Sequence, residues 1–284
     1  MSKVAIVTDS TSCMPPELLK EYDIRVVPVG MVMNGRVYRD MVDITAAEFW
    51  KIFPDIKEQP TTTAGNPGDF VTVFGELAKA TDNIVCILVS KALTATFESA
   101  YLARKLVKAD HPDVNIHIID SRTSAGALGF IVLEAAKTAR AGKPVGEVLK
   151  VVDDMTSRVI YVAALDTLKY LINIGRAPKN ANIGEMLNVK PIIGFVDDGG
   201  LIEVVGRVGG KEKALNKMVD MVKKYVDIKN PLHVIVHYSN RPEEGEQLKQ
   251  LVASRYKCAE LLFTEYTPVM CSATGPMVGM GFYT

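Results

Sequence analysis

The chain has 284 residues, of which 48% are hydrophobic and 23% are charged, as in ordinary soluble globular proteins. Its 33 basic and 33 acidic side chains balance, so no overall basic field favours binding to nucleic acid or to anionic lipid. The length exceeds the size at which one hydrophobic core usually stops growing, which favours two domains over one.

The cysteines and the start of the chain indicate a cytoplasmic protein. The four cysteines show no CxxC pair, as expected of reduced thiols, and do not suggest a zinc site; they are Cys13, Cys86, Cys258 and Cys271. The chain opens on a strand-like apolar run without the pattern of a secretory signal. Its apolar runs, such as residues 125–132, are well short of the ~18 residues that a transmembrane helix needs.

The first half of the chain alternates short Val- and Ile-rich runs with helical patterns. Such nearly continuous apolar runs are typical of parallel strands that are buried on both faces, and they cover 4–9, 24–33, 83–90 and 114–120. The predicted helices cover 15–22, 44–53, 67–80, 94–109 and 124–141. Two helix starts carry caps, a Thr45/Glu48 capping box and Asn66 before Pro67. We therefore predict a doubly wound sheet, with a ligand crevice at the carboxyl ends of its strands.

The second half, after Gly142, has a mixed pattern. Helices are predicted over 145–155, 211–226 and 243–255, and strands over 159–165, 189–196, 201–208, 232–239 and 259–266, before a tail rich in Gly and Met. The second and third of these strands form a hairpin around the Asp-Asp-Gly-Gly turn at 197–200. We predict an α/β protein of two lobes, an N-terminal parallel-sheet lobe (1–157) and a C-terminal α/β lobe of α+β type (158–284).

Hydroxyl side chains gather where predicted strands lead into helices. These groups are Ser10, Thr11 and Ser12 after Asp9; Thr61, Thr62 and Thr63; Ser90 with Thr94 and Thr96; and Ser121 after Asp120. Hydroxyls and the free amides of helix starts together bind anions, and a carboxylate is a good match when part of the site is apolar. Ser and Thr are also common helix caps, which would explain any single group without a ligand. The three threonines at 61–63 fit that explanation less well, because Asn66 is the expected cap of the next helix.

Two other features suggest alternatives. Arg176 follows a glycine at the end of a short predicted helix, where it either pairs with an anionic head group or only complements the helix C-terminus.

Asp9 could be the nucleophile of a phosphotransferase or hydrolase that also uses the threonine cluster. Enzymes of the haloacid-dehalogenase type carry a second Asp two residues later as acid and base, but this chain has Thr11 there. A third alternative is a pure interaction protein whose cavity is filled by side chains.

The sequence predicts no metal and no cofactor. His233 and His237 lie in a strand pattern, which places them roughly 13 Å apart at ~3.3 Å per residue, too far to share one zinc ion. We expect both to be structural. The chain has no Ser-His-Asp order, P-loop or GxGxxG motif, so it offers binding groups without an obvious catalytic base.

Taken together, these residues resemble the DegV family, whose bacterial members bind long-chain fatty acids and include the carrier subunit of fatty acid kinase. The resemblance extends through both halves of the chain. It is carried by VTDSTS at the start, Tyr38-Arg39-Asp40 followed by Asp43-Ile44, PTTTAGNPGDF, SKALTATFESA, IIDSRTSAGALG, LDTLKYLINIGR and LNVKPII. The order and spacing of these segments make the resemblance specific.

The resemblance implies a non-enzymatic carrier that encloses an acyl chain between two lobes and holds its carboxylate on hydroxyls. The family's head-group contacts match Thr62 with its neighbour Thr63, Thr94 where the family usually has serine, and Arg176. The full predicted site is Thr62, Thr63, Thr94, Arg176, Ser10, Thr61, Thr96 and Ala273. The implied partners are a long-chain fatty acid and a fatty acid kinase subunit.

The chain departs from the family pattern at several positions. Ala273 stands where the family often has the histidine of H-x-G-P-G, and Gly209 where it often has arginine. Lys91 and Ala95 replace the usual serine and glycine of the family's SSxLSGT turn. The changes at 209 and 273 put in doubt whether a kinase subunit docks on this chain, and they affect the binding fold less.

Overall fold

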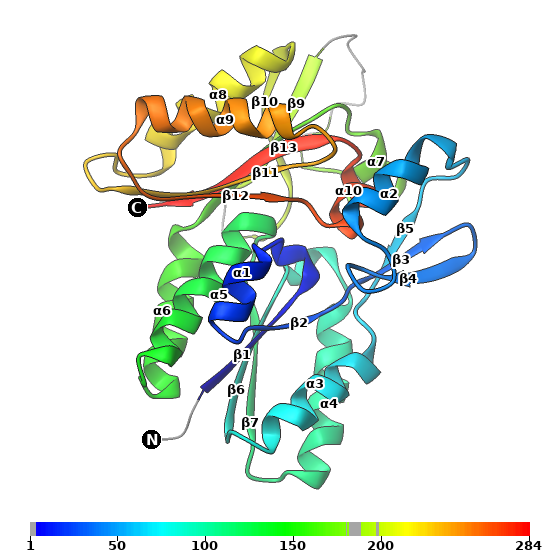
Figure 1. The fold of residues 1–284 in the computed structure, drawn as a ribbon, viewed down its shortest axis with the longest axis vertical. Coiled ribbons are helices and arrows are strands. Elements are labelled where there is room, and N and C mark those ends of the chain that lie inside the picture. Colours follow the sequence, from blue (N-terminus) through cyan, green and yellow to red (C-terminus); the bar gives the residue numbers. More distant parts are fainter. Residues whose placement is uncertain (1–3, 180, 182–188, 197–198) are drawn as a thin grey trace.

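The computed structural model describes residues 4–179, 181, 189–196 and 199–284, which form two lobes (Figure 1). The N-terminal lobe contains a parallel sheet with the strand order β2-β1-β6-β7. These strands are β1 (Val4–Asp9), β2 (Arg25–Val27), β6 (Asn83–Leu88) and β7 (Asn115–Asp120). The expected parallel sheet is therefore confirmed. Its central strands β1 and β6 are buried on both faces, which explains their nearly continuous apolar sequence.

Helices cover both faces of the parallel sheet. One face is packed by α3 (Pro67–Ala78) and α4 (Thr96–Asp110), whose Phe70, Phe74 and Phe97 are buried against the sheet. The other face is packed by α5 (Ala125–Arg140), which in turn packs on α6 (Val145–Arg158); the short α1 spans Pro16–Glu21. The predicted caps are present, since Thr45 and Glu48 form the capping box of α2 (Ala46–Ile52) and Asn66 caps α3.

The C-terminal lobe contains a six-stranded mixed sheet with the order β10-β9-β8-β13-β11-β12. The strands are β8 (Ile160–Leu165), β9 (Val189–Phe195), β10 (Glu203–Gly209), β11 (Leu232–Tyr238), β12 (Cys258–Glu265) and β13 (Met277–Tyr283). Helices α8 (Lys211–Tyr225) and α9 (Pro242–Arg255) cover one face of this sheet (Figure 1). The Gly- and Met-rich tail is thus a central strand, antiparallel to both neighbours. The predicted hairpin of β9 and β10 is confirmed, although residues 197–198 of its turn lie outside the described residues.

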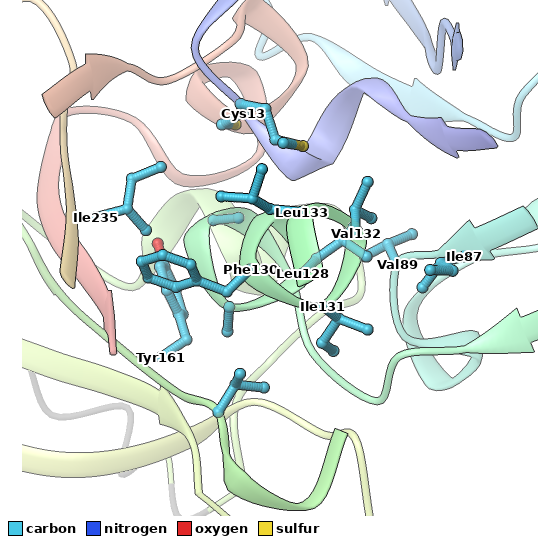
Figure 2. Close-up of a cluster of buried hydrophobic side chains, with 14 of the residues drawn as sticks. Cys13, Ile87, Val89, Leu128, Phe130, Ile131, Val132, Leu133, Tyr161 and Ile235 are labelled. Carbon is cyan, nitrogen blue, oxygen red and sulfur yellow. The ribbon is translucent and has the colours of Figure 1, made fainter. Parts of the chain in front are cut away.

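Helix α5 joins the two lobes because it is apolar on nearly all sides and packs between both sheets. Figure 2 shows its Leu128, Phe130 and Ile131 side chains between Ile87 on one side and Tyr161 on the other, which belong to the two different sheets. The predicted division at 157/158 falls at the end of α6, just before β8, and stays a prediction. Among the helices of the described residues, none combines the length and apolar character needed to cross a bilayer.

The predicted strand over 24–33 is wrong in one respect, because it is two strands in different sheets. The run breaks at Pro28, which has no N–H for a sheet ladder, and the chain continues as β3 (Gly30–Met33). Strand β3 lies at the centre of a small antiparallel sheet with the order β4-β3-β5, where β4 is Arg36–Arg39 and β5 is Thr61–Thr63. The three threonines therefore form an edge strand rather than a loop.

The close contact between α5 and β13 gives a prediction about stability. A Cβ atom at Gly281 would lie 2.5 Å from the backbone of Gly126 and Ala127, so a side chain there must push the helix away from the sheet. We expect Gly281→Ala to lower the free energy of unfolding by about 1–3 kcal/mol. Gly146→Ala is the control, since its Cβ meets nothing within 4 Å in α6. Urea unfolding that gave equal stability for the two variants would contradict this packing.

Candidate functional site

A cavity of about 270 Å³ lies between the two lobes and is lined by residues from both. Its apolar lining includes Leu93 from the N-terminal lobe and Leu171, Ile174, Ile193, Phe195 and Ile202 from the C-terminal lobe. Its polar lining includes Thr62, Thr63, Thr94, Ser124 and Arg176. A mainly apolar cavity with a few polar groups is the usual form of a small-molecule site.

Strand β5 places two threonines in the cavity wall. Thr62 pairs with Met31 and Thr63 with Gly30 of β3, and both threonine side chains are half-buried. A Cβ atom at Gly30 would lie 1.9 Å from the Thr63 hydroxyl oxygen, so any larger residue at position 30 would force that hydroxyl out of its present position. Within the described part of the chain, the Thr62 hydroxyl has no hydrogen-bond partner, which leaves it available to a ligand.

The start of α4 places a third threonine in the wall. Thr94 lies between a short 3-10 turn and the first residue of α4, and its hydroxyl accepts from the Thr96 amide at 3.1 Å. The same oxygen lies 2.8 Å from the hydroxyl of Thr96, which also accepts from the Gly65 amide at 3.2 Å. The exposed Ala95 lines the cavity directly before the N-terminus of the 15-residue α4. The partial positive charge of that terminus favours an anion nearby.

Arg176 adds a full positive charge to the cavity. Its Nε donates to the carbonyl oxygen of Leu93 at 2.5 Å, and one terminal nitrogen donates to that of Ile174 at 3.4 Å. These bonds fix the half-buried guanidinium against both lobes. Among the described residues, no carboxylate lies within ion-pair distance of Arg176, so none of them balances its charge. A partly buried cation without a counter-charge attracts an anionic group.

The structure brings five of the eight predicted site residues into the cavity lining: Thr62, Thr63, Thr94, Arg176 and Ala273. It places the other three elsewhere. Thr61 is exposed, and Ser10 and Thr96 are buried behind the wall. The Ser10 hydroxyl accepts from the Val29 amide at 3.1 Å. Whether any of the eight contacts a ligand stays a prediction.

Sequence reasoning missed several polar residues of the lining. Thr11 and Ser124 lie in or beside hydroxyl groups at strand ends, so a signal for them was present. Tyr161 and Thr274 had no such signal, because they reach the cavity only through packing of the C-terminal lobe. The Tyr161 hydroxyl is 2.6 Å from that of Tyr266. Helix α10 (Pro268–Thr274), which supplies four lining residues, was not predicted.

Asp9 is a buried structural carboxylate in this fold. Its Oδ1 accepts from the amide and hydroxyl of Thr11, and its Oδ2 accepts from the Val89 amide at 2.8 Å. Burial raises the pKa of Asp9, and these hydrogen bonds oppose the increase. The side chain is fully buried and is not part of the cavity lining. Oδ1 thus holds the turn after β1 and Oδ2 joins β1 to the end of β6, which does not favour a nucleophilic role.

The two histidines lie on β11, as expected, at different depths. His237 is fully buried and stacks on Tyr266, with ring centroids 4.9 Å apart. His233 is half-buried, and its Nδ1 lies 3.3 Å from Oε2 of Glu260. Burial lowers the pKa of His237 to about 3, so it is neutral at ordinary pH. Among the described residues, no three His, Cys, Asp or Glu side chains are grouped as a metal site requires.

A second buried carboxylate, Asp40, gives a pH-dependent prediction. Burial raises its pKa from 3.8 to about 6, although Ser10, Thr267 and the Val269 amide partly oppose this. The folded protein therefore holds this proton more tightly than the unfolded chain. This tighter binding contributes about 3 kcal/mol to the free energy of unfolding. The contribution is fully present below about pH 4 and is lost as the pH rises through 6.

Asp40→Asn removes this titration and keeps an oxygen that can accept from the Val269 amide, whose bond to Asp40 is 3.0 Å long. We expect the difference in the free energy of unfolding, variant minus wild type, to rise by about 3 kcal/mol from pH 4 to pH 7. Urea unfolding at pH 4, 5, 6 and 7 measures this difference. Parallel pH profiles for the two proteins would contradict the burial of a titrating carboxyl at this position.

Comparison with known proteins shows similarity along the whole chain. A family model described as an uncharacterised protein of the DegV family matches residues 3–284. A DegV domain-containing protein from Caldanaerobacter subterraneus subsp. tengcongensis is 37% identical over 224 residues, which are 78% of each chain. One from Clostridium perfringens is 33% identical over 248 residues, 86% of each chain.

Solved structures show the same similarity. A fatty-acid-binding DegV family protein from Thermus thermophilus aligns with a TM-score of 0.90 and 27% identity, over 99% of both chains. A stearic-acid-binding protein from Eubacterium ventriosum aligns with a TM-score of 0.89 and 27% identity, over 100% of this chain and 98% of the other. DegV, a fatty-acid-binding protein from Bacillus subtilis, aligns with a TM-score of 0.87 and 26% identity, over 100% and 99%.

Proposed function

This chain belongs to the DegV family, and from that premise we propose that it binds a long-chain fatty acid in the cavity between its lobes. The proposal is supported by fatty-acid binding in solved proteins that are 26–27% identical over nearly the whole chain. It is also supported by the composition of the cavity wall. The bound acid would lie with its alkyl tail among the apolar residues and its carboxylate near Thr62, Thr94 and Arg176.

The observation that carries this proposal is the positive charge of Arg176, which no carboxylate of the described residues balances, in an otherwise mainly apolar cavity. An alkyl tail with one anionic end matches that combination. Burying about 14 methylenes at ~0.8 kcal/mol each gives on the order of 11 kcal/mol of gross affinity. A charge-assisted hydrogen bond adds about 1.5–3 kcal/mol. The tail thus supplies most of the affinity, and the polar groups orient the ligand.

The carboxylate contact is tested by comparing palmitate with hexadecanol, which has the same tail and no charge. We expect palmitate to bind about 10- to 150-fold more tightly to the wild type, as one or two charge-assisted contacts would give. Arg176→Met should reduce this ratio, because it keeps an apolar stem of similar length. Displacement of a fluorescent fatty acid measures both affinities.

Arg104→Met is the matched control, since Arg104 lies on α4 away from the cavity lining. It should leave the palmitate-to-hexadecanol ratio unchanged. Equal affinities of the wild type for the two ligands would refute binding of the carboxylate at Arg176 and leave only tail recognition.

We further propose that the chain acts as a carrier that presents the bound acid to a fatty acid kinase subunit and does not itself catalyse a reaction. The arrangement of Asp9 supports the second half of this proposal, since both of its oxygens already accept hydrogen bonds. Purified chain with oleate, ATP and Mg²⁺ should produce no acyl phosphate. Turnover that is lost in Asp9→Asn would instead support the phosphotransferase or hydrolase alternative.

A further inference from the structure

Helix α10 forms one wall of the cavity and is held at both of its ends by side chains of the N-terminal lobe. The helix has seven residues, and Val269, Met270, Ala273 and Thr274 line the cavity. A helix of two turns has little stability of its own. Its position must therefore come from the contacts that surround it.

Asp40 holds the first turn of α10. It follows strand β4, and its Oδ1 accepts from the Val269 amide of α10 at 3.0 Å. The Asp40 amide donates to the carbonyl of Val29 at 3.0 Å, which ties the same residue to the segment just before β3. The side chain is 1% exposed. This carboxylate thus joins the small three-stranded sheet of one lobe to the helix of the other.

Gln59 holds the last turn of α10 together with α7 (Lys169–Asn173). Its Nε2 donates to the carbonyl of Tyr170 at 2.9 Å, with a longer contact of 3.5 Å to that of Ser272 in α10. Its Oε1 accepts from the side-chain amide of Asn173 at 3.0 Å. One half-buried side chain, two residues before β5, thereby contacts two helices of the opposite lobe.

Packing around Tyr170 reinforces this end. The Tyr170 ring lies 6.0 Å from the Phe53 ring, which follows α2, and a Cβ atom at Gly275 would lie 2.4 Å from the Tyr170 ring. The C-terminal end of α10 is thus fitted closely against Tyr170. Figure 1 shows α2 and β5 beside α7 and α10 on the same side of the molecule. Asp40 and Gln59 bracket this contact at its two ends.

We propose that Asp40 and Gln59 are positioning residues of the ligand site, which hold α10 and α7 against the threonine strand β5 and so set how slowly a bound ligand leaves. The inference rests on the proposed function, since it concerns the same cavity. A ligand enclosed between the lobes can leave only when part of the cavity wall moves. Helix α10 is part of that wall, and it can move away only if its hydrogen bonds to Asp40 and Gln59 break. Removing either side chain lowers the cost of opening without removing a group that lines the cavity.

Two disruptive variants, one conservative variant and one control test the proposal. Gln59→Leu removes three polar contacts at similar size, and Asp40→Leu removes the bond to the Val269 amide. Asp40→Asn is the conservative variant that keeps an acceptor for that amide. Gln247→Leu is the control, because Gln247 is on α9 and is not part of the cavity lining. Stopped-flow displacement of cis-parinaric acid gives the dissociation rate of each protein.

We expect dissociation about 5- to 30-fold faster for Gln59→Leu and Asp40→Leu, from the loss of one or two hydrogen bonds each. Asp40→Asn should recover most of the wild-type rate, and Gln247→Leu all of it. Amide hydrogen exchange over residues 267–275 of the ligand-free protein should be faster in the same two variants. If Asp40→Leu does not fold, Gln59→Leu at its half-buried position carries the test alone.

Dissociation rates within twofold of the wild type in Gln59→Leu, together with unchanged exchange over 267–275, would overturn the inference while the proposed function stands. A wild type that takes up no parinaric acid at all would overturn both. The two failures are therefore distinguishable, because the first needs a wild type that binds and the second a wild type that does not.

Discussion

Ala273→Trp should abolish fatty-acid binding, with an affinity loss of at least 100-fold. Ala273 lies on α10 and lines a cavity of about 270 Å³, so an indole at this position would fill much of the cavity volume. The loss comes from the tail, which supplies most of the affinity at ~0.8 kcal/mol per buried methylene. Blocking room for four methylenes already removes about 3 kcal/mol. Titration with a fluorescent fatty acid measures the change.

Ala92→Trp is the matched control for this substitution. Ala92 is exposed in the turn before α4, close in sequence to Thr94 but outside the cavity lining. It should bind the fluorescent acid like the wild type. Because the tryptophan of Ala273→Trp fills an existing void, that variant should remain folded in a melting experiment. A folded Ala273→Trp variant with wild-type affinity would show that the ligand lies elsewhere.

Lengthening the acyl chain should raise affinity steeply and then stop doing so. Palmitate has six methylenes more than decanoate, which corresponds to about 5 kcal/mol, or roughly three to four orders of magnitude in Kd. The gain should end once the tail fills the cavity, since its wall includes the buried side chains of Ile193, Phe195 and Ile202. Isothermal titration with saturated acids of increasing length measures this dependence.

The head group is the same throughout that series, so the carboxylate contacts act as an internal control. An affinity that changed by less than tenfold between decanoate and palmitate would mean that the carboxylate, and not the tail, dominates binding. Such a result would contradict an enclosed alkyl site and would favour a surface anion site at Arg176 and the threonines.

The architecture was predictable where a local pattern determines the structure. Runs of Val and Ile such as Asn83–Leu88 form parallel strands because both of their faces are buried, and the capping box of Thr45 sets the start of α2. The Asn34-Gly35 dipeptide, with both residues at positive φ, is a hairpin signal that would have revealed β3 and β4. Reading 24–33 as one strand missed the break at Pro28.

The candidate site was predictable mainly on its N-terminal side, and Arg176 and Ala273 were the predicted lining residues of the C-terminal lobe. Thr62 and Thr94 stand out in sequence because they are polar residues at element ends, where helix starts also favour anions. The opposite wall comes from apolar residues such as Leu171 and Phe195, which look like ordinary core residues until the lobes are packed together. The contacts of Gln59 are likewise 111 and 213 residues distant along the chain, and no local pattern predicts them.

Native mass spectrometry of the purified protein, before and after incubation with oleate or palmitate, tests the account most directly. We expect a 1:1 complex whose mass excess equals one fatty acid, either already present after purification or formed on incubation. Folded protein that carries no lipid and takes up neither acid would contradict a fatty-acid site between the lobes.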